Sequence, residues 1–209
     1  ADGGHLIIEA EEYEDFIRKE PKAQKYIKRL TGAAEFINNK DRYCLWLVDV
    51  SPKELRSMPL VMNRIELCRN DRLAGAPDRQ KLADTPSIFR ETKNPSQYMV
   101  VPRVSSENRR YIPIGFLDDS TIPTDSATII EDASLYDFGI LTSNVHMAWM
   151  RTVAGRLKSD YRYSAKIVYN NFPWSEVTDE QKEMISKTAQ AILDARALYP
   201  ESSLADLYD

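Results

Sequence analysis

Residues 98–117, YMVVPRVSSENRRYIPIGFL, hold two strand-like runs on either side of a short polar segment. The runs 98–104 and 111–117 are rich in β-branched and aromatic side chains, and the segment SSENRR between them has the polarity of a turn. We therefore predict a β-hairpin. Pro102 and Pro113 lie inside the runs, and because proline cannot donate a backbone hydrogen bond it favours sheet edges or bulges.

Helical patterns surround the hairpin in the sequence. Residues 7–30 have the pattern of two short helices broken at Pro21, and Ser51 followed by a proline is typical of a helix start. Further helices are predicted from about 60 to 73, from 144 to 153 and from about 176 to 200, and strands at 42–49 and 127–130. The last helix is expected to bury one apolar stripe, formed by Met184, Ile185, Ile192, Ala195 and Tyr199. Together these elements predict an α+β fold with a mixed or antiparallel sheet, flanking helices and a C-terminal helical element.

The charge of the chain is nearly balanced. Its 209 residues include 28 Lys and Arg against 32 Asp and Glu, so binding of an anion requires uneven placement of these charges. No apolar run is long enough to cross a membrane, and no secretory signal is present, which favours a cytoplasmic protein. The chain begins without Met, so we expect it to be a piece of a longer protein.

The sequence contains no recognisable catalytic or metal-binding set. Cys44 and Cys68 lie in apolar runs typical of buried thiols, and His146 has the context of a packed helix residue, so no zinc site can be assembled. No glycine-rich turn follows a strand, as a nucleotide or S-adenosylmethionine site would require. The segment YNNFPW is interpreted as a turn that Pro173 fixes and that Phe172 and Trp174 pack against the protein. We assign no catalytic residue and no metal ligand.

A basic stretch at 155–174, GRLKSDYRYSAKIVYNNFPW, is the strongest candidate for binding. If LKSDYRYS is one extended strand, Lys158, Asp160 and Arg162 project from the same face. Two-residue spacing separates Lys158 and Asp160 by roughly 6.6 Å along the chain. A cation beside an anion matches guanine acceptors paired with the cytosine amino donor in the major groove. The plainer interpretation is a solvated ladder of ion pairs, each worth less than about 1 kcal/mol.

A second basic cluster lies near the turn SSENRR. Such a turn could bind phosphates without sequence preference, or could simply be an exposed hairpin tip. The residues assigned to the DNA backbone are Arg103, Arg109, Arg110, Arg156 and Lys166.

Long segments of the chain resemble one known family. They read EFINNKDRYCLWLVDVSPKELR at 35–56, VPRVSSENRRYIPIGFL at 101–117, ASLYDFGILTSNVHMAWMRTVAGRLKSDYRYSAKIVYNNFPW at 133–174 and ILDARALYPESSLADLYD at 192–209. They resemble the carboxy-terminal part of MmeI-like proteins, type IIG or IIL restriction-modification enzymes in which one chain joins an endonuclease region, an adenine-N6 methyltransferase and a target recognition domain.

This resemblance implies a target recognition domain over residues 1–132 and, over 133–209, a C-terminal region that completes it, with a helical tail from about 176. The module would bind double-stranded DNA and direct an upstream methyltransferase domain of the same chain. S-adenosylmethionine, and Mg²⁺ if the nuclease is active, would be bound upstream. The family's base-reading positions correspond to Lys158, Asp160, Arg162 and Ser126. The alternative from another class is a protein-interaction or assembly module that reads no bases.

Overall fold

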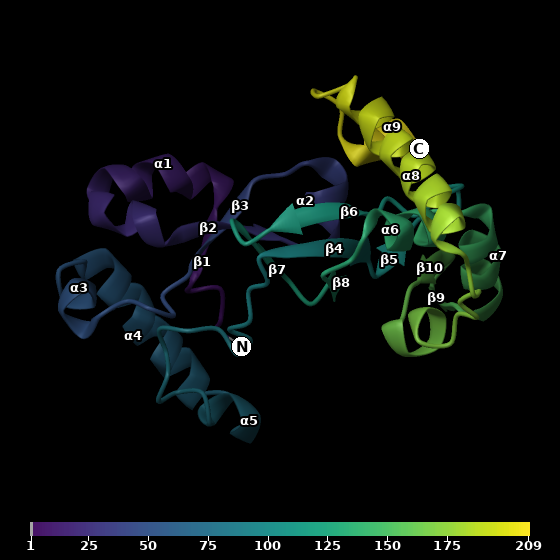
Figure 1. Cartoon of the computed structure of the whole chain (residues 1–209). Helices are drawn as coiled ribbons and strands as arrows, with labels where there is room; N and C mark the ends of the chain where they lie inside the picture. Colours follow the sequence, from purple (N-terminus) through teal and green to yellow (C-terminus); the bar gives the residue numbers. More distant parts are fainter. Residues whose placement is uncertain (1) are drawn as a thin grey trace. The chain divides into compact units, whose positions relative to one another are not determined.

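The computed structural model describes residues 2–209, which form two compact units (Figure 1). Of these residues, unit 1 comprises 2–30, 41–94 and 120–122, and unit 2 comprises 31–40, 95–119 and 123–209. Each unit contains both strands and helices, so the predicted α+β class is confirmed.

Unit 1 is built on a four-stranded sheet in the order β1-β3-β2-β7. It contains, wholly or for the most part, β1 (Ile7–Glu9), α1 (Ala10–Lys19), the 3-10 helix η1 (Pro21–Tyr26), β2 (Ile27–Thr31), β3 (Arg42–Leu45), α3 (Pro52–Arg56), α4 (Pro59–Leu73), α5 (Pro77–Gln80) and β7 (Thr121–Pro123). Both β1 and β2 pair antiparallel with β3. The core includes Leu6, Ile8, Leu45, Val61 and Cys68.

Two predictions for unit 1 need correction. The second helix expected before residue 30 is present only as the 3-10 helix η1 over Pro21–Tyr26. The chain then continues as the strand β2, whose Ile27 pairs with Leu45 and whose Arg29 pairs with Tyr43. The strand expected at 42–49 ends at Leu45. A short apolar run does not distinguish helix from strand by itself, and here the pairing with β3 decides. Ser51 caps α3 as predicted, because its Oγ accepts a hydrogen bond from the Glu54 amide.

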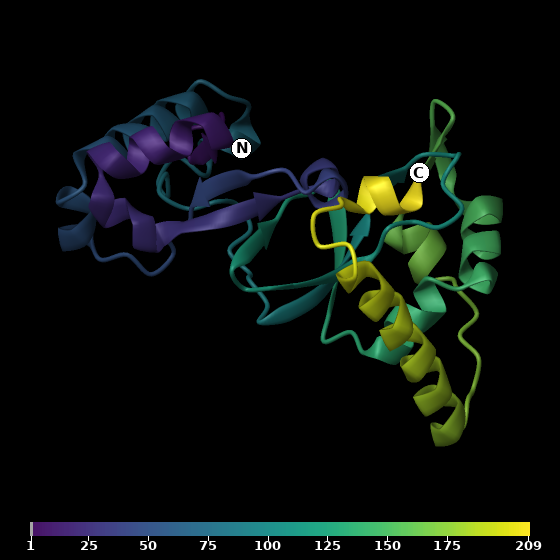
Figure 2. The same cartoon turned by 90° about the horizontal axis from the view of Figure 1, so that it is seen from above.

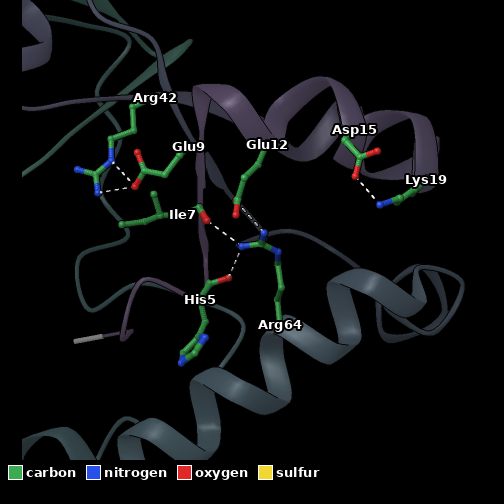
Figure 3. Close-up of polar contacts among 8 residues, drawn as sticks. All are labelled: His5, Ile7, Glu9, Glu12, Asp15, Lys19, Arg42 and Arg64. Atoms are coloured by element: carbon green, nitrogen blue, oxygen red, sulfur yellow. Dashed lines mark hydrogen bonds and ion pairs between the residues drawn. The ribbon is translucent and has the colours of Figure 1, made fainter.

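In unit 1, arginine side chains connect helices and strands through hydrogen bonds and ion pairs (Figure 3). The Arg64 guanidinium, from α4, donates to the carbonyl oxygens of His5 at 3.2 Å and Ile7 at 2.8 Å, and pairs with Glu12 of α1 at 3.1 Å. One side chain therefore links α4 to both the first strand and the helix that follows it.

Unit 2 is built on a three-stranded sheet in the order β6-β4-β8, and a second small sheet has the order β5-β10-β9. Its elements are α2 (Ala33–Asn38), β4 (Gln97–Pro102), β5 (Val104–Ser105), β6 (Gly115–Asp118), β8 (Ala127–Glu131), α6 (Leu135–Leu141), α7 (Asn144–Val153), β9 (Gly155–Leu157), β10 (Asp160–Arg162), the π-helix η2 (Ala165–Tyr169), α8 (Asp179–Ala197) and α9 (Leu204–Tyr208). Figure 1 shows β6 and β4 side by side, as their antiparallel pairing requires.

The predicted hairpin is half right. Its two arms do pair antiparallel, with Tyr98 opposite Leu117. The tight turn is wrong, because the chain leaves β4 after Pro102, forms β5 and returns only at Gly115. β4 is the middle strand, but its pairing with β6 ends at Val100, so Pro102 pairs with β8 alone and lies at a local edge, as expected for a proline. Pro113 precedes β6.

The core of unit 2 lies on both faces of β4. Met99 and Val101 belong to the main cluster with Phe138 and Leu141, while Tyr98 and Val100 face a smaller cluster on the opposite side. Successive side chains of a strand point to opposite faces, so β4, apolar after the exposed Gln97, is buried on both of its faces. The capped helix predicted at 144–153 is confirmed, with Ser143 as its cap.

The long helix α8 packs against α6. Its N-terminus is capped by Thr178, whose hydroxyl accepts a hydrogen bond from the Gln181 amide. Gly139 of α6 permits the close approach, because a Cβ there would lie 2.7 Å from Ile185. The predicted apolar stripe is partly wrong, since Met184 is 67% exposed and Tyr199 is 58% exposed. The inward face instead runs through Ile185 and the fully buried Ala189.

Candidate nucleic-acid interface

The small sheet β5-β10-β9 brings together the two basic segments that the sequence showed separately. Val104 of β5 lies opposite Arg162 of β10, and Ser105 lies opposite Tyr161. On its other edge β10 pairs with β9, where Asp160 lies opposite Leu157. The segment after β4 and the stretch 155–162 therefore form one surface of unit 2.

The backbone at this surface turns where a continuous strand was predicted. Residues 155–162 form a β-hairpin with the two-residue loop Lys158-Ser159, and Lys158 has a φ of 56°. The even alternation expected from Lys158 to Ser164 is therefore wrong at its first step. The reason is that β9 and β10 satisfy their backbone groups by pairing with each other, which a single extended strand could not do. Lys158 sits exposed at the tip, and Figure 2 shows the hairpin, in green, projecting from the helices of unit 2.

The alternation does hold along β10 itself. Tyr161 and Tyr163 are buried in the core of unit 2, whereas Arg162 is exposed. The Tyr163 hydroxyl lies 3.0 Å from Nε2 of the fully buried His146 of α7. Burial lowers the pKa of His146 to about 4 and raises the pKa of the Tyr163 phenol, so both groups are neutral near pH 7. Two anchored aromatic rings thus fix the strand that carries the outward charges.

Arg156 folds back onto its own hairpin. Its Nη1 donates to the Ser159 carbonyl at 2.6 Å, and its guanidinium lies over the Tyr161 ring, 3.8 Å from the centroid. Glu107 Oε2 lies 3.7 Å from the same guanidinium. Arg156, which the sequence assigned to the DNA backbone, is therefore held against its own hairpin, although its side chain remains 44% exposed.

Asp160 is also held, from the loop that follows β5. The Glu107 amide donates to Asp160 Oδ1 at 3.3 Å, and Asp160 is half-buried. The carboxylate therefore has a defined orientation beside the tip of the hairpin.

Backbone hydrogen bonds connect two further predicted positions, Ser126 and Arg103, to this surface. The Arg103 amide donates to the Ser126 carbonyl at 3.1 Å, and the Tyr163 amide donates to the Arg103 carbonyl at 2.8 Å. The Ser126 hydroxyl accepts from the Ala33 amide at 2.9 Å, which occupies part of its hydrogen-bonding capacity. Ser126 therefore lies two backbone hydrogen bonds from the end of β10.

The arginines of the SSENRR segment differ in their surroundings. Arg109 pairs with both carboxylate oxygens of Asp209, and its side chain is only 12% exposed. Arg110 is exposed, with its guanidinium 5.4 Å from the centroid of the Tyr111 ring. The acidic tail thus returns to this loop, and it neutralises one of the cations assigned to phosphate contact.

Four of the cations predicted to contact DNA are exposed and have no polar or ring partner in the part of the chain that the structure describes. Within residues 2–209, the side chains of Arg103, Lys158, Arg162 and Lys166 form no hydrogen bond or ion pair. They are carried by the segment after β4, the tip of the hairpin, β10 and η2. The roles assigned to them stay predictions, and their placement leaves each able to contact an anion.

Sequence reasoning missed the residues that hold the site in place. The sequence showed Glu107 only as one polar residue of a predicted turn and Asp209 only as the last residue of the chain, so their pairing with Arg156 and Arg109 was not predicted. Nothing in the local sequence relates Glu107 to Arg156, since 49 positions separate them and only the pairing of β5 with β10 brings them together. His146 was recognised as a packed helix residue, and its complete burial confirms that prediction. Cys44 and Cys68 are likewise buried free thiols, as predicted.

Residues 2–209 lack two further kinds of feature. No three His, Cys, Asp or Glu side chains in that range gather closely enough to hold a metal ion. No helix in the same range has both the length and the apolar character needed to span a bilayer.

Comparison with known proteins identifies relatives along the whole chain. The family model of the MmeI target recognition domain matches residues 1–176, and that of the MmeI C-terminal domain matches residues 177–209. DNA methyltransferase A of Bacillus subtilis (strain 168) is 44% identical over 210 residues, a match that covers 100% of this chain and 24% of the relative.

A solved structure shows the same fold. It is that of the Type IIL restriction-modification enzyme MmeI in complex with DNA, and it matches with a TM-score of 0.96 and 44% identity over 100% of this chain and 28% of that one. The chain thus spans about a quarter of the length of these relatives. The two family models together cover residues 1–209, and each of the two relatives matches the whole chain. The chain therefore belongs to the MmeI family, as a target recognition domain followed by the family's C-terminal domain.

Proposed function

We propose that this chain is the module that recognises a specific duplex DNA sequence within a larger DNA methyltransferase. The observation that carries the proposal is the β9–β10 hairpin, whose tip and outward strand face carry Lys158, Asp160 and Arg162. A two-stranded β-ribbon fits the major groove of B-form DNA, where all four base pairs present distinct donors and acceptors. The relative solved in complex with DNA has the same fold, which supports this use of the surface.

The two charged residues nearest the tip suit a G·C pair. Lys158 can donate to guanine N7 and O6, and Asp160 can accept from the cytosine amino group. Lys158 lies in the loop and Asp160 is the first residue of β10, so the two side chains would approach the base pair from the tip of the hairpin and from the strand directly beside it. Arg162 and Ser126 are proposed to contact neighbouring bases.

The remaining cations are proposed to contact phosphates. Arg103, Arg110 and Lys166 are exposed around the hairpin, and contacts of this kind fix the position of a protein on DNA without reading sequence. Arg109 would contribute only if the duplex displaced Asp209, because the two side chains are already paired.

The whole protein is proposed to be a cytoplasmic, site-specific adenine-N6 methyltransferase, with or without endonuclease activity. The upstream domains would bind S-adenosylmethionine, and Mg²⁺ where the nuclease functions. This module would place the duplex so that the target adenine can leave the stack and enter the methyltransferase. We also propose that residues 1–132 form the target recognition domain and that residues 133–209 form a C-terminal region that completes it.

Binding of the full-length protein to labelled duplexes tests the proposal. We expect tight binding to the sequence it methylates, weaker binding to other duplexes, and a strong decrease of both with added salt. Equal affinity for all duplexes would contradict sequence recognition. An absence of duplex binding, together with a stable complex with a second polypeptide, would favour the assembly module instead.

A further inference from the structure

We propose that Glu107 and Arg156 form a clamp that sets the position of Lys158 and Asp160, and so determine base specificity without contacting a base. The inference rests on the proposed function, because it concerns how the same hairpin reads DNA. It assigns a role to Glu107, which the sequence left without one. It also changes the role of Arg156 from a phosphate contact to a positioning residue.

The Lys158-Ser159 loop needs support. Lys158 has a φ of 56°, a left-handed conformation that costs an ordinary L-residue about 1–2 kcal/mol. Both loop residues are exposed, so no core packing determines their conformation. Without another contact, a lysine at the tip of a two-residue hairpin would sample several orientations.

Arg156 supplies the contact inside the hairpin. Its 2.6 Å hydrogen bond to the Ser159 carbonyl closes the loop from the β9 side. Its guanidinium is flat and lies over the buried Tyr161 ring, 3.8 Å from the centroid, so the donor is held against a fixed surface. A lysine in its place would keep the charge but has neither the planar group nor the second donor edge.

Glu107 connects this contact to the neighbouring loop. Its carboxylate lies 3.7 Å from the Arg156 guanidinium, while its own amide donates to Asp160 Oδ1 at 3.3 Å. One residue therefore holds the cation that closes the loop and the anion proposed to read cytosine. The Glu107 carboxylate is also about half-exposed close to where the DNA phosphates would lie, a position that disfavours binding unless the residue has another use.

Two conservative variants, Arg156→Lys and Glu107→Gln, distinguish a positioning role for these residues from a purely electrostatic one. If Arg156 only contacts phosphate, Arg156→Lys retains the charge and leaves sequence discrimination intact. If Glu107 is only a nearby negative charge, Glu107→Gln strengthens binding to every duplex. If the two residues form the clamp, both variants lose discrimination at one base pair, and the charge removed by Glu107→Gln adds only a uniform change that all duplexes share.

The experiment uses the full-length protein, its methylated site, and a set of duplexes in which one base pair of the site at a time is inverted. For Arg156→Lys and Glu107→Gln we expect the preference for the correct pair to fall about tenfold at a single position, within the range for one base contact. Matched controls are Arg69→Lys and Glu183→Gln, which make the same exchanges at exposed positions on α4 and α8. Thermal unfolding of each variant verifies that it is folded.

The double variant tests whether the two residues act through one contact. Because each exchange breaks the same support, Arg156→Lys with Glu107→Gln should lose no more discrimination than the worse single variant. Unchanged discrimination in both single variants, with or without a uniform change for all duplexes, or losses that multiply in the double variant would each overturn the clamp while leaving DNA recognition in place. A wild-type protein with no sequence preference would overturn the proposed function as well.

Discussion

Lys158 occupies a backbone conformation that opposes stability, and replacing it should reveal why a lysine is there. A left-handed residue costs about 1–2 kcal/mol for an ordinary side chain, and asparagine relieves part of this cost by local hydrogen bonding. Lys158→Asn should therefore raise the free energy of unfolding by about 0.5–1 kcal/mol. Lys158→Gly should gain less, because glycine also increases the entropy of the unfolded chain by roughly 0.4–1 kcal/mol.

Lys158→Asn should also lose discrimination between base pairs. Without the ammonium group at the tip, the preference of the full-length protein for its site over the single inverted pair should fall by about tenfold or more. The matched control is Lys187→Asn within the helix α8, where the exchange lowers helix propensity and should reduce stability by about 0.5 kcal/mol without affecting discrimination.

Urea unfolding and competition between duplexes measure the two effects separately. The combination of higher stability with lower discrimination is expected if the strained conformation is kept for the contact that Lys158 makes. A stabilised Lys158→Asn variant that still discriminates fully would refute that reasoning. A destabilised variant would show that the turn does not impose the predicted cost.

Three further changes have definite expected outcomes. Arg110→Ala should weaken binding to all duplexes equally and lower the slope of log affinity against log salt by about one, measured by a salt titration; a loss confined to one sequence would contradict a phosphate contact. Tyr163→Phe removes the hydroxyl that partners the buried His146 and should lower the free energy of unfolding by about 1–2 kcal/mol in urea; an unchanged midpoint would argue against that hydrogen bond. Burial lowers the pKa of His146 from 6.5 to about 4, so unfolding takes up a proton in this window and stability should fall as the pH drops through it, by about 3 kcal/mol at most. His146→Gln should flatten this part of the profile, and an equally steep profile in the variant would assign the dependence to other groups.

The elements predicted well from the sequence are those whose signals are local. Ser51, Ser143 and Thr178 each mark a helix start by a side chain that accepts a hydrogen bond three residues later, and all three are caps in the structure. The strand at 127–131 is likewise local, since its β-branched residues favour an extended backbone. The α+β class follows from such signals alone.

The errors occur where distant pairing decides the structure. Residues 27–31 form a strand only because they pair with β3. Residues 104–105 pair with β10, at the point where the chain was expected to pass from a strand into a tight turn. In the proposed site, alternation along β10 predicted the buried tyrosines and the outward Arg162 correctly. It could not show the reversal at Lys158-Ser159, because neither residue is a glycine or asparagine that would mark a left-handed turn.

The most direct test of the central claim is sequencing of methylated positions in DNA from cells that carry the complete gene, either wild-type or with Lys158→Glu and Asp160→Arg together. The exchange reverses the donor and acceptor that we propose to face one base pair. The methylated sequence should change from G·C to C·G at one position and stay the same at every other. Identical methylated sites in the two strains would contradict base reading by the β9–β10 hairpin.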